Sequence, residues 1–283
     1  MVTPFKADGS VDYAEAVRLA NHLADNGTDT VLLSGTTGES PTLTHEEEMI
    51  LFREVKQGLG GKAKVMAGTG SNSTRTAVAM TKKAGELGLD GALLVVPYYN
   101  KPSQEGLYQH FKAVNDAADL PLVIYNIPGR TSRNMECETT LRLAELSNYV
   151  AVKEASGDLE QMKKIVAAAP RDFVLYSGDD NLTLDVLRLG GVGVVSVAAQ
   201  LVGPQMKKML DAYFAGDLET AEAMDKDLQD IFQVIFITTN PAPVKAALNM
   251  RGFHCGIPRL PLVDLTEDER EQVRQALIKH GLL

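Results

Sequence analysis

Short apolar runs alternate with longer amphipathic segments from residue 13 almost to residue 200, and this alternation limits the chain to a few folds. The runs are apolar throughout, which is typical of parallel strands covered on both faces. The segments between them have helical periodicity and helix starts, such as the capping-box pair Thr44 and Glu47. Strands are therefore expected over residues 30–35, 64–70, 91–99, 120–128, 150–156, 173–178 and 191–199. Repeated βα units predict an α/β fold, either a closed (β/α)8 TIM barrel or a long doubly wound sheet.

Two features favour the barrel. The nucleotide-binding patterns of doubly wound folds are missing, because no GxGxxG opens a helix after the first run and GTTGES at 35–40 lacks the lysine of a phosphate loop. Polar residues also recur where the expected strands end, among them Thr37, Tyr99, Tyr125 and Lys153. In a barrel those ends meet at one mouth, where active sites lie.

The strand pattern stops near residue 204, and the rest of the chain has the pattern of several helices. This change predicts a catalytic barrel over residues 1–204 and a helical segment over 205–283 that completes and flanks it. The N-terminus has no apolar signal-peptide core, and no run is long enough to span a membrane.

The charge and the cysteines exclude several classes of partner. A net charge of −9 argues against nucleic acid and anionic membranes, which bind basic surfaces. Cys137 and Cys255 lie far apart, outside any CxxC or Cys/His cluster, so neither a disulfide framework nor a zinc site is expected. A cytoplasmic protein without a metal is the expectation.

A lysine stands in the middle of an apolar strand, VAVKEAS at 150–156. Strand alternation puts Lys153 on one face with Ala151 and Ala155, and the valines and Glu154 on the other, where the valines would pack against the outer helices. An amine among apolar walls has a lowered pKa, and the neutral amine forms Schiff bases with carbonyls. The alternative is a solvated Lys–Glu pair at a frayed strand end.

Other strand ends offer the remaining groups that Schiff-base chemistry needs. Tyr125, on the preceding strand, is expected beside Lys153, and Thr37 and Tyr99 could complete a proton relay, although a buried tyrosine is as often a core residue. The GTTGES loop could hold a carboxylate through backbone N–H groups and hydroxyls, or could be only a turn. Arg130 could grip a second carboxylate, or could be a surface arginine.

Taken together, GTTGES, PYYNKPSQEGLYQHF, YNIPGRT, VKEASGD, SGDD and NPAPVKAAL, in this order, resemble the dihydrodipicolinate synthase family over nearly the whole chain. The resemblance implies a (β/α)8 barrel that condenses pyruvate with L-aspartate-4-semialdehyde through a Schiff-base lysine, on the route to diaminopimelate and lysine, with no metal or other cofactor. Related lyases of N-acetylneuraminate and keto-sugar acids share the lysine and tyrosine. Arg130 favours the synthase, because it suits a small aldehyde that carries a carboxylate. A non-catalytic barrel that senses a keto acid is the alternative of another class, and the complete residue set argues against it.

The resemblance also implies a role for each residue. Lys153 would form the Schiff base, and Tyr125, Thr37 and Tyr99 would relay protons. Tyr99 would reach into the site of a neighbouring subunit, usually within a homotetramer. Thr36 and Thr37, with the backbone around Val195, would hold the pyruvate carboxylate, and Arg130 that of the semialdehyde.

Two departures from the family pattern have consequences. Family members have several more residues ahead of MVTPF, so the first barrel strand is expected to be truncated here. The lysine-inhibition site of the family would comprise Ser40, His45, Asn72 and Tyr98. Its usual glutamate is replaced by Thr76, which predicts a degenerate site unless Glu48 supplies the carboxylate.

Overall fold

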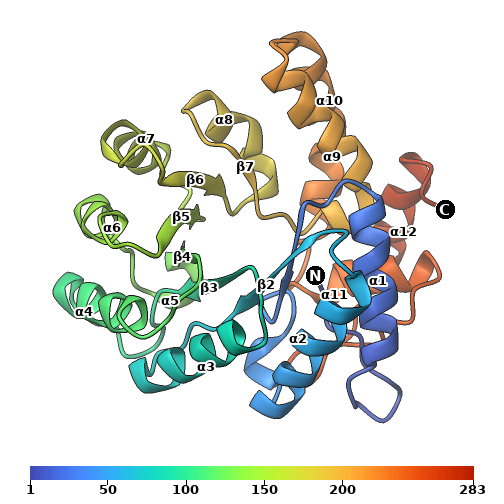
Figure 1. Ribbon diagram of the computed structural model, residues 1–283. Coiled ribbons are helices and arrows are strands. Elements are labelled where there is room, and N and C mark those ends of the chain that lie inside the picture. Colours follow the sequence, from blue (N-terminus) through green and yellow to red (C-terminus); the bar gives the residue numbers. More distant parts are fainter. The chain divides into compact units, whose positions relative to one another are not determined.

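The computed structural model describes residues 1–283, which form two units. The first combines Met1–Val65 with Val197–Leu283, and the second is Met66–Ser196. Strand β2 begins in the first unit and ends in the second. Figure 1 labels the elements of both.

The second unit is built on parallel strands that pair in chain order, from β2 to β7. Its strands are β2 (Lys64–Gly68), β3 (Gly91–Val95), β4 (Leu122–Asn126), β5 (Tyr149–Glu154), β6 (Val174–Ser177) and β7 (Gly193–Val194). Its helices are α3 (Thr74–Glu86), α4 (Gln104–Asn115), α5 (Pro128–Thr131), α6 (Cys137–Ala144), α7 (Leu159–Ala168), η2 (Asp180–Leu182) and α8 (Thr183–Arg188).

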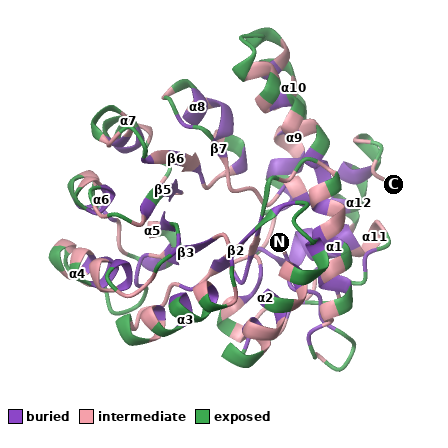
Figure 2. Ribbon diagram, viewed as in Figure 1, coloured by how far each residue is buried: buried purple, intermediate pink, exposed green.

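Burial explains why apolar runs became strands and amphipathic segments became helices. Every residue of β4 is buried, as expected for a strand covered on both faces. Helix α4 instead buries one stripe, which includes Leu107, Phe111 and Val114. Figure 2 shows the buried and exposed faces of these helices in different colours.

The first unit is mainly helical. It contains α1 (Tyr13–Asp25), β1 (Thr30–Leu33), η1 (Ser40–Thr42), α2 (His45–Leu59), α9 (Ala199–Phe214), α10 (Leu218–Val234), α11 (Ala242–Met250) and α12 (Glu267–Lys279). The predicted capping box at Thr44 is confirmed, and Thr266 forms a second one at α12. No strand precedes α1; the Met1 amino group donates to the Leu32 carbonyl of β1 at 2.6 Å.

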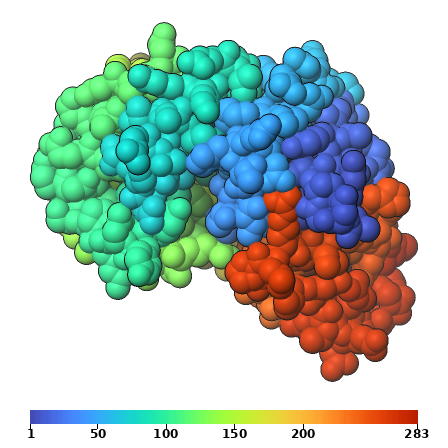
Figure 3. All heavy atoms as spheres, turned by 90° about the horizontal axis from the view of Figure 1, so that it is seen from below, coloured from blue at the N-terminus to red at the C-terminus, as the bar shows by residue number.

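Residues from the two ends of the sequence pack together within the first unit. The Phe5 N–H donates to the Cys255 carbonyl at 3.1 Å. The Phe5 ring also lies under two cations, with Lys245 Nζ 4.0 Å and Arg259 Cζ 4.4 Å from its centroid. Figure 3 shows the orange-red C-terminal atoms against the blue N-terminal ones. The N-terminal segment is therefore held by residues more than two hundred positions further along the chain.

The predicted strands occur where expected, with shorter bounds. The largest difference is at 191–199, where β7 covers Gly193–Val194 and α9 already begins at Ala199. The predicted boundary after residue 204 falls within α9, at Pro204. None of the helices combines the length and apolar character that crossing a lipid bilayer requires.

Candidate active site

Lys153 lies in β5 opposite Tyr125 of β4, as the sequence predicts. Its Nζ is 4.1 Å from the centroid of the Tyr125 ring. The side chain of Lys153 is buried, with 8% of the residue exposed, yet its amine has neither an ion-pair nor a hydrogen-bond partner. A largely enclosed amine without a counter-ion in contact with it is costly for stability. Its retention beside a phenol points to chemistry at the nitrogen.

Gly178, after β6, makes room for the lysine stem. Its N–H donates to the Glu154 carbonyl at 2.7 Å, which brings its backbone against β5. A Cβ at this position would lie 3.1 Å from Lys153 Cε and 2.7 Å from Ala155 Cβ. Glycine is therefore needed here because any side chain would collide with Ala155 and crowd the Glu154 carbonyl and the lysine stem.

The opposite face of β5 carries a buried carboxylate network that sequence reasoning missed. Glu154 accepts hydrogen bonds from Asn126 at 3.0 Å, from Gln161 at 3.1 Å and from the Ser156 N–H at 2.9 Å. Burial raises the pKa of the Glu154 carboxyl, and these donors act in the opposite direction. Because Asn126 and Glu154 directly follow Tyr125 and Lys153, the network fixes the ends of both strands. Val152 is fully buried, whereas Val150 is 38% exposed at the start of the strand, so the prediction that the valines pack against helices is wrong for Val150.

Asp179, in the SGDD motif, lies within electrostatic reach of the lysine. Burial raises the pKa of the Asp179 carboxyl, and the Lys153 charge works against that increase. The Asp179 N–H donates a hydrogen bond to Ser177 Oγ at 3.2 Å. A carboxylate near a lysine amine stabilises a positive charge on that nitrogen, and no sequence pattern singled out Asp179 for this role.

The GTTGES loop belongs to the first unit and is held by C-terminal residues. Glu39 has a left-handed backbone, with φ +57°, which is uncommon outside glycine. Its carboxylate pairs with Lys245 Nζ at 2.7 Å and accepts the Arg259 N–H at 2.9 Å. Two residues earlier, Thr37 Oγ1 accepts a hydrogen bond from Asn240 Nδ2 at 2.9 Å. Side-chain bonds to C-terminal residues therefore hold the loop that carries Thr36 and Thr37.

The remaining predicted residues are all in the second unit. Tyr99 follows β3 with φ +72° and is 89% exposed, an unusual state for a bulky side chain. Arg130 is exposed on α5, and its guanidinium has no ion-pair partner. The Val195 N–H donates to the Ser177 carbonyl at 2.9 Å, which extends the strand pairing past β7.

The residues predicted for lysine inhibition also fall in both units. In the first unit, buried Glu48 accepts a hydrogen bond from the Ser40 hydroxyl at 2.9 Å and pairs with His45 at 3.1 Å. Burial raises the pKa of Glu48. In the second, Asn72 Nδ2 donates to the Tyr98 carbonyl at 3.3 Å.

Lys245 is the other buried lysine, and its surroundings differ from those of Lys153. Burial lowers its pKa, which alone would suggest a nucleophile, but the Glu39 carboxylate opposes the change. Its side chain is 1% exposed and Nζ also donates to the Ile257 carbonyl at 3.3 Å. The Lys245 amine thus has a structural role.

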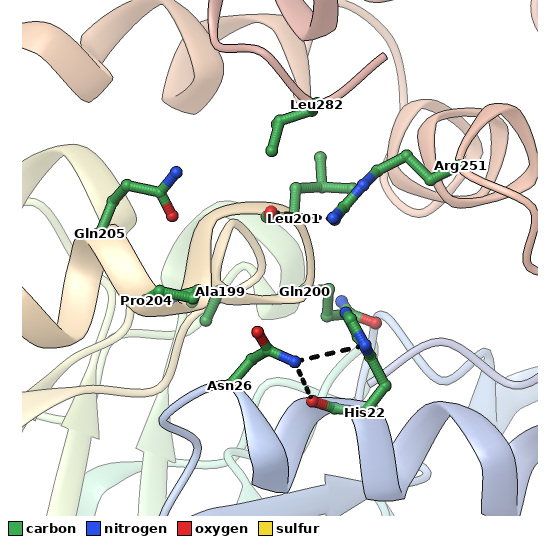
Figure 4. A pocket seen from close by; sticks show the side chains of 10 residues that line it. His22, Asn26, Ala199, Gln200, Leu201, Pro204, Gln205, Arg251 and Leu282 are labelled. Atoms are coloured by element: carbon green, nitrogen blue, oxygen red, sulfur yellow. Dashed lines mark hydrogen bonds between the residues drawn. The ribbon is translucent and has the colours of Figure 1, made fainter.

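A cavity of about 140 Å³ in the first unit contains none of the predicted catalytic residues. It is lined by α1, the start of α9 and Arg251, and Figure 4 shows the Asn26 amide bonded to the His22 carbonyl at its edge. No group of three or more His, Cys, Asp or Glu side chains is placed to hold a metal ion.

Comparisons with known proteins agree with this geometry. The profile described as "Dihydrodipicolinate synthetase family" matches residues 1–280. A 4-hydroxy-tetrahydrodipicolinate synthase of Moorella thermoacetica is 55% identical over 283 residues, which is 100% of this chain and 97% of the relative. The synthase of the same name in Thermosynechococcus vestitus is also 55% identical, and the match covers 100% of this chain and 96% of that relative. The crystal structure of DHDPS from Cyanidioschyzon merolae with lysine bound has a TM-score of 0.99 at 52% identity, covering 100% of this chain and 97% of that one.

The fold and the unpaired lysine define a (β/α)8-barrel enzyme with C-terminal helices, so the predicted fold class is confirmed. More specifically, the chain belongs to the dihydrodipicolinate synthetase family.

Proposed function

We propose that this enzyme condenses pyruvate with L-aspartate-4-semialdehyde to give 4-hydroxy-tetrahydrodipicolinate, a step toward diaminopimelate and lysine. The observation that carries the proposal is the unpaired amine of buried Lys153 over the Tyr125 ring, in a chain 55% identical to synthases of that name.

The chemistry would begin with attack of Lys153 Nζ on the ketone carbon of pyruvate. The carbinolamine loses water to form an imine, and loss of a methyl proton gives the enamine. The enamine carbon then attacks the aldehyde carbon of the second substrate. The amino group of that substrate displaces Lys153 at the imine carbon and closes the ring. Tyr125, Thr37 and Tyr99 are the proposed carriers of the protons that these steps move.

Two carboxylates must be held during the reaction. Thr36 and Thr37, together with the backbone around Val195, are proposed to bind that of pyruvate. Arg130 is proposed to bind that of the semialdehyde, and its guanidinium has no competing ion pair in the chain. This assignment favours the synthase over a lyase of N-acetylneuraminate or keto-sugar acids, whose hydroxyl-rich substrates would need hydrogen-bonding side chains instead.

We also propose a homotetramer built from dimers, with Tyr99 completing the site of its neighbour. The support is the exposure of Tyr99 in a left-handed backbone, because such strain is normally retained for function. A relative 42% identical is described as a monomeric dihydrodipicolinate synthase variant, so assembly varies among related proteins. Residues 1–204 remain the proposed catalytic barrel, 205–283 the flanking helical segment, and the cytoplasm the expected location.

Trapping the imine tests the central assignment. Pyruvate with borohydride should convert Lys153 into a stable secondary amine, found by mass mapping of peptides. Lys153→Ala should remain folded and lose both labelling and activity. Lys163→Ala is the control, because Lys163 is exposed on α7 and its loss should leave labelling and activity unchanged. Labelling at Lys245 in the wild-type chain would refute the assignment.

A further inference from the structure

Asn240 lies just before α11, in the C-terminal part of the chain, and is 4% exposed. Its only side-chain hydrogen bond runs from Nδ2 to Thr37 Oγ1, at 2.9 Å, across 203 positions of sequence. Sequence reasoning singled out Thr37 but gave Asn240 no role.

This hydrogen bond determines what the Thr37 hydroxyl can do. A hydroxyl has one proton to donate and two lone pairs to accept with. Because Asn240 donates to the oxygen, the Thr37 proton is directed away from Asn240. Thr37 is thus prepared as a donor, which is the role that a carboxylate ligand requires.

Fold stability does not account for Asn240. Its Oδ1 is buried and has no hydrogen-bond partner. A buried, unsatisfied carbonyl is destabilising, and replacing such a group by an apolar one can be neutral or favourable. Unsatisfied buried groups in native proteins call for an explanation other than stability.

The surroundings give Asn240 a rigid support. Helix α11 begins two residues later and carries Lys245, which pairs with Glu39 at 2.7 Å. Asn240 and Lys245 therefore hold the GTTGES loop at two points, Thr37 and Glu39, from one short stretch of chain. A donor placed this firmly fixes the direction of a hydroxyl and not only its position.

We propose that Asn240 is a positioning residue that turns the Thr37 hydroxyl toward bound pyruvate as a hydrogen-bond donor. The proposal rests on the proposed function and adds to it a residue of the C-terminal segment that acts through Thr37.

The test compares Asn240→Ala with the wild-type enzyme. The KM for pyruvate should rise about tenfold, the order expected for loss of one oriented hydrogen bond to a charged group. The melting temperature should stay within a few degrees or increase. A lower melting temperature with an unchanged KM would show a structural role and overturn the proposal.

A double-variant cycle shows whether Asn240 acts through Thr37. In a Thr37→Val chain, adding Asn240→Ala should raise the pyruvate KM no further. Additive effects would mean that the two residues act independently. Asn240→Asp reverses the donor direction, because a carboxylate only accepts. It should impair pyruvate binding at least as much as Asn240→Ala, and wild-type KM in Asn240→Asp would contradict the proposed direction.

Asn249 supplies the matched control. It is an asparagine of α11 that accepts from the Cys255 N–H and donates to the Gly256 carbonyl, both at 2.8 Å, and makes no hydrogen bond to the GTTGES loop. Asn249→Ala should lower the melting temperature without changing the pyruvate KM. Borohydride trapping distinguishes failure of the proposed function from failure of the role proposed for Asn240. A wild-type chain that forms no pyruvate adduct refutes the proposed function. An adduct in the wild type with unchanged KM in Asn240→Ala refutes only the role of Asn240.

Discussion

At the scale of single residues, the two buried lysines show how one side chain serves two purposes. Lys245 has a carboxylate at 2.7 Å, which stabilises its ammonium form inside the fold. Lys153 has an aromatic ring at 4.1 Å and no carboxylate partner. The paired amine of Lys245 is therefore structural, whereas the unpaired amine of Lys153 fits the covalent role proposed for it.

Arg130→Ala should raise the KM for the semialdehyde much more than that for pyruvate. Loss of a charged hydrogen bond costs about 1.5–3 kcal/mol, or roughly ten- to a hundredfold in binding. Steady-state kinetics with each substrate varied in turn measures the two KM values. Arg142→Ala is a suitable control, because that arginine pairs with exposed Glu105 on the surface. Equal changes in both KM values would assign Arg130 a structural role.

Gly178→Ala should impair imine formation. The new methyl would lie 2.7 Å from Ala155 Cβ, 3.0 Å from the Glu154 carbonyl oxygen and 3.1 Å from Lys153 Cε, so the end of β5 that carries the lysine has to shift. The rate of borohydride labelling should fall at least tenfold, while circular dichroism remains that of the wild type. Gly129→Ala is the control, since nothing lies within 4 Å of its added Cβ. Normal labelling in Gly178→Ala would show that the lysine needs no such space.

At the scale of elements, neighbouring strands were predictable and distant contacts were not. The pairing of Tyr125 with Lys153 follows from two apolar runs that are consecutive in the chain. The bonds of Thr37 to Asn240 and of Glu39 to Lys245 join residues 203 and 206 positions apart, and no local periodicity encodes them. The run at 191–199 was assigned entirely to a strand because periodicity does not separate a short apolar strand from the start of a buried helix.

The pair that joins the GTTGES loop to α11 should be important for stability. Lys245→Met leaves the Glu39 carboxylate buried without its counter-ion, and such changes cost about 3–5 kcal/mol. Adding Glu39→Gln removes that charge and should recover part of the loss. Urea denaturation of the single and double variants measures both effects.

The exposed pair of Lys207 with Asp211 provides the comparison, because Lys207→Met should change stability by less than about 1 kcal/mol. If Lys245→Met were equally mild, the buried pair would not be what braces the loop.

At the scale of the whole molecule, the exposed Tyr99 predicts that active sites are shared between chains. Lys153→Ala and Tyr99→Phe chains should each be nearly inactive, yet activity should return when they are mixed and reassembled. In a two-fold dimer with random pairing, about a quarter of the sites would then contain both intact residues. Recovery of no activity from well-mixed dimers would place Tyr99 in its own chain's site, and an active Tyr99→Phe chain before mixing would place Tyr99 outside the chemistry.

Regulation by lysine should be weak in this protein. Thr76 offers a neutral hydroxyl, which bonds Ser73 at 3.1 Å, and loss of a charged partner costs about 1.5–3 kcal/mol. Glu48 is 3% exposed and already holds Ser40 and His45, so it is poorly placed to replace that partner.

A lysine titration should therefore give no appreciable inhibition at low millimolar concentration, whereas Thr76→Glu should increase sensitivity. Half-inhibition of the wild type below about 1 mM, roughly −4 kcal/mol, would show that the effector site is functional.

The joining of Phe5 to Cys255 and of Glu39 to Lys245 also has a consequence for synthesis on the ribosome. Strands β2 to β7 pair with their neighbours in chain order, so that part can assemble while translation continues. The GTTGES loop leaves the ribosome early but acquires its anchors only after residue 245 has been made. The nascent chain therefore holds Lys153 in place before its threonine loop is finished, so under the proposed function enzymatic competence is the last property that it gains.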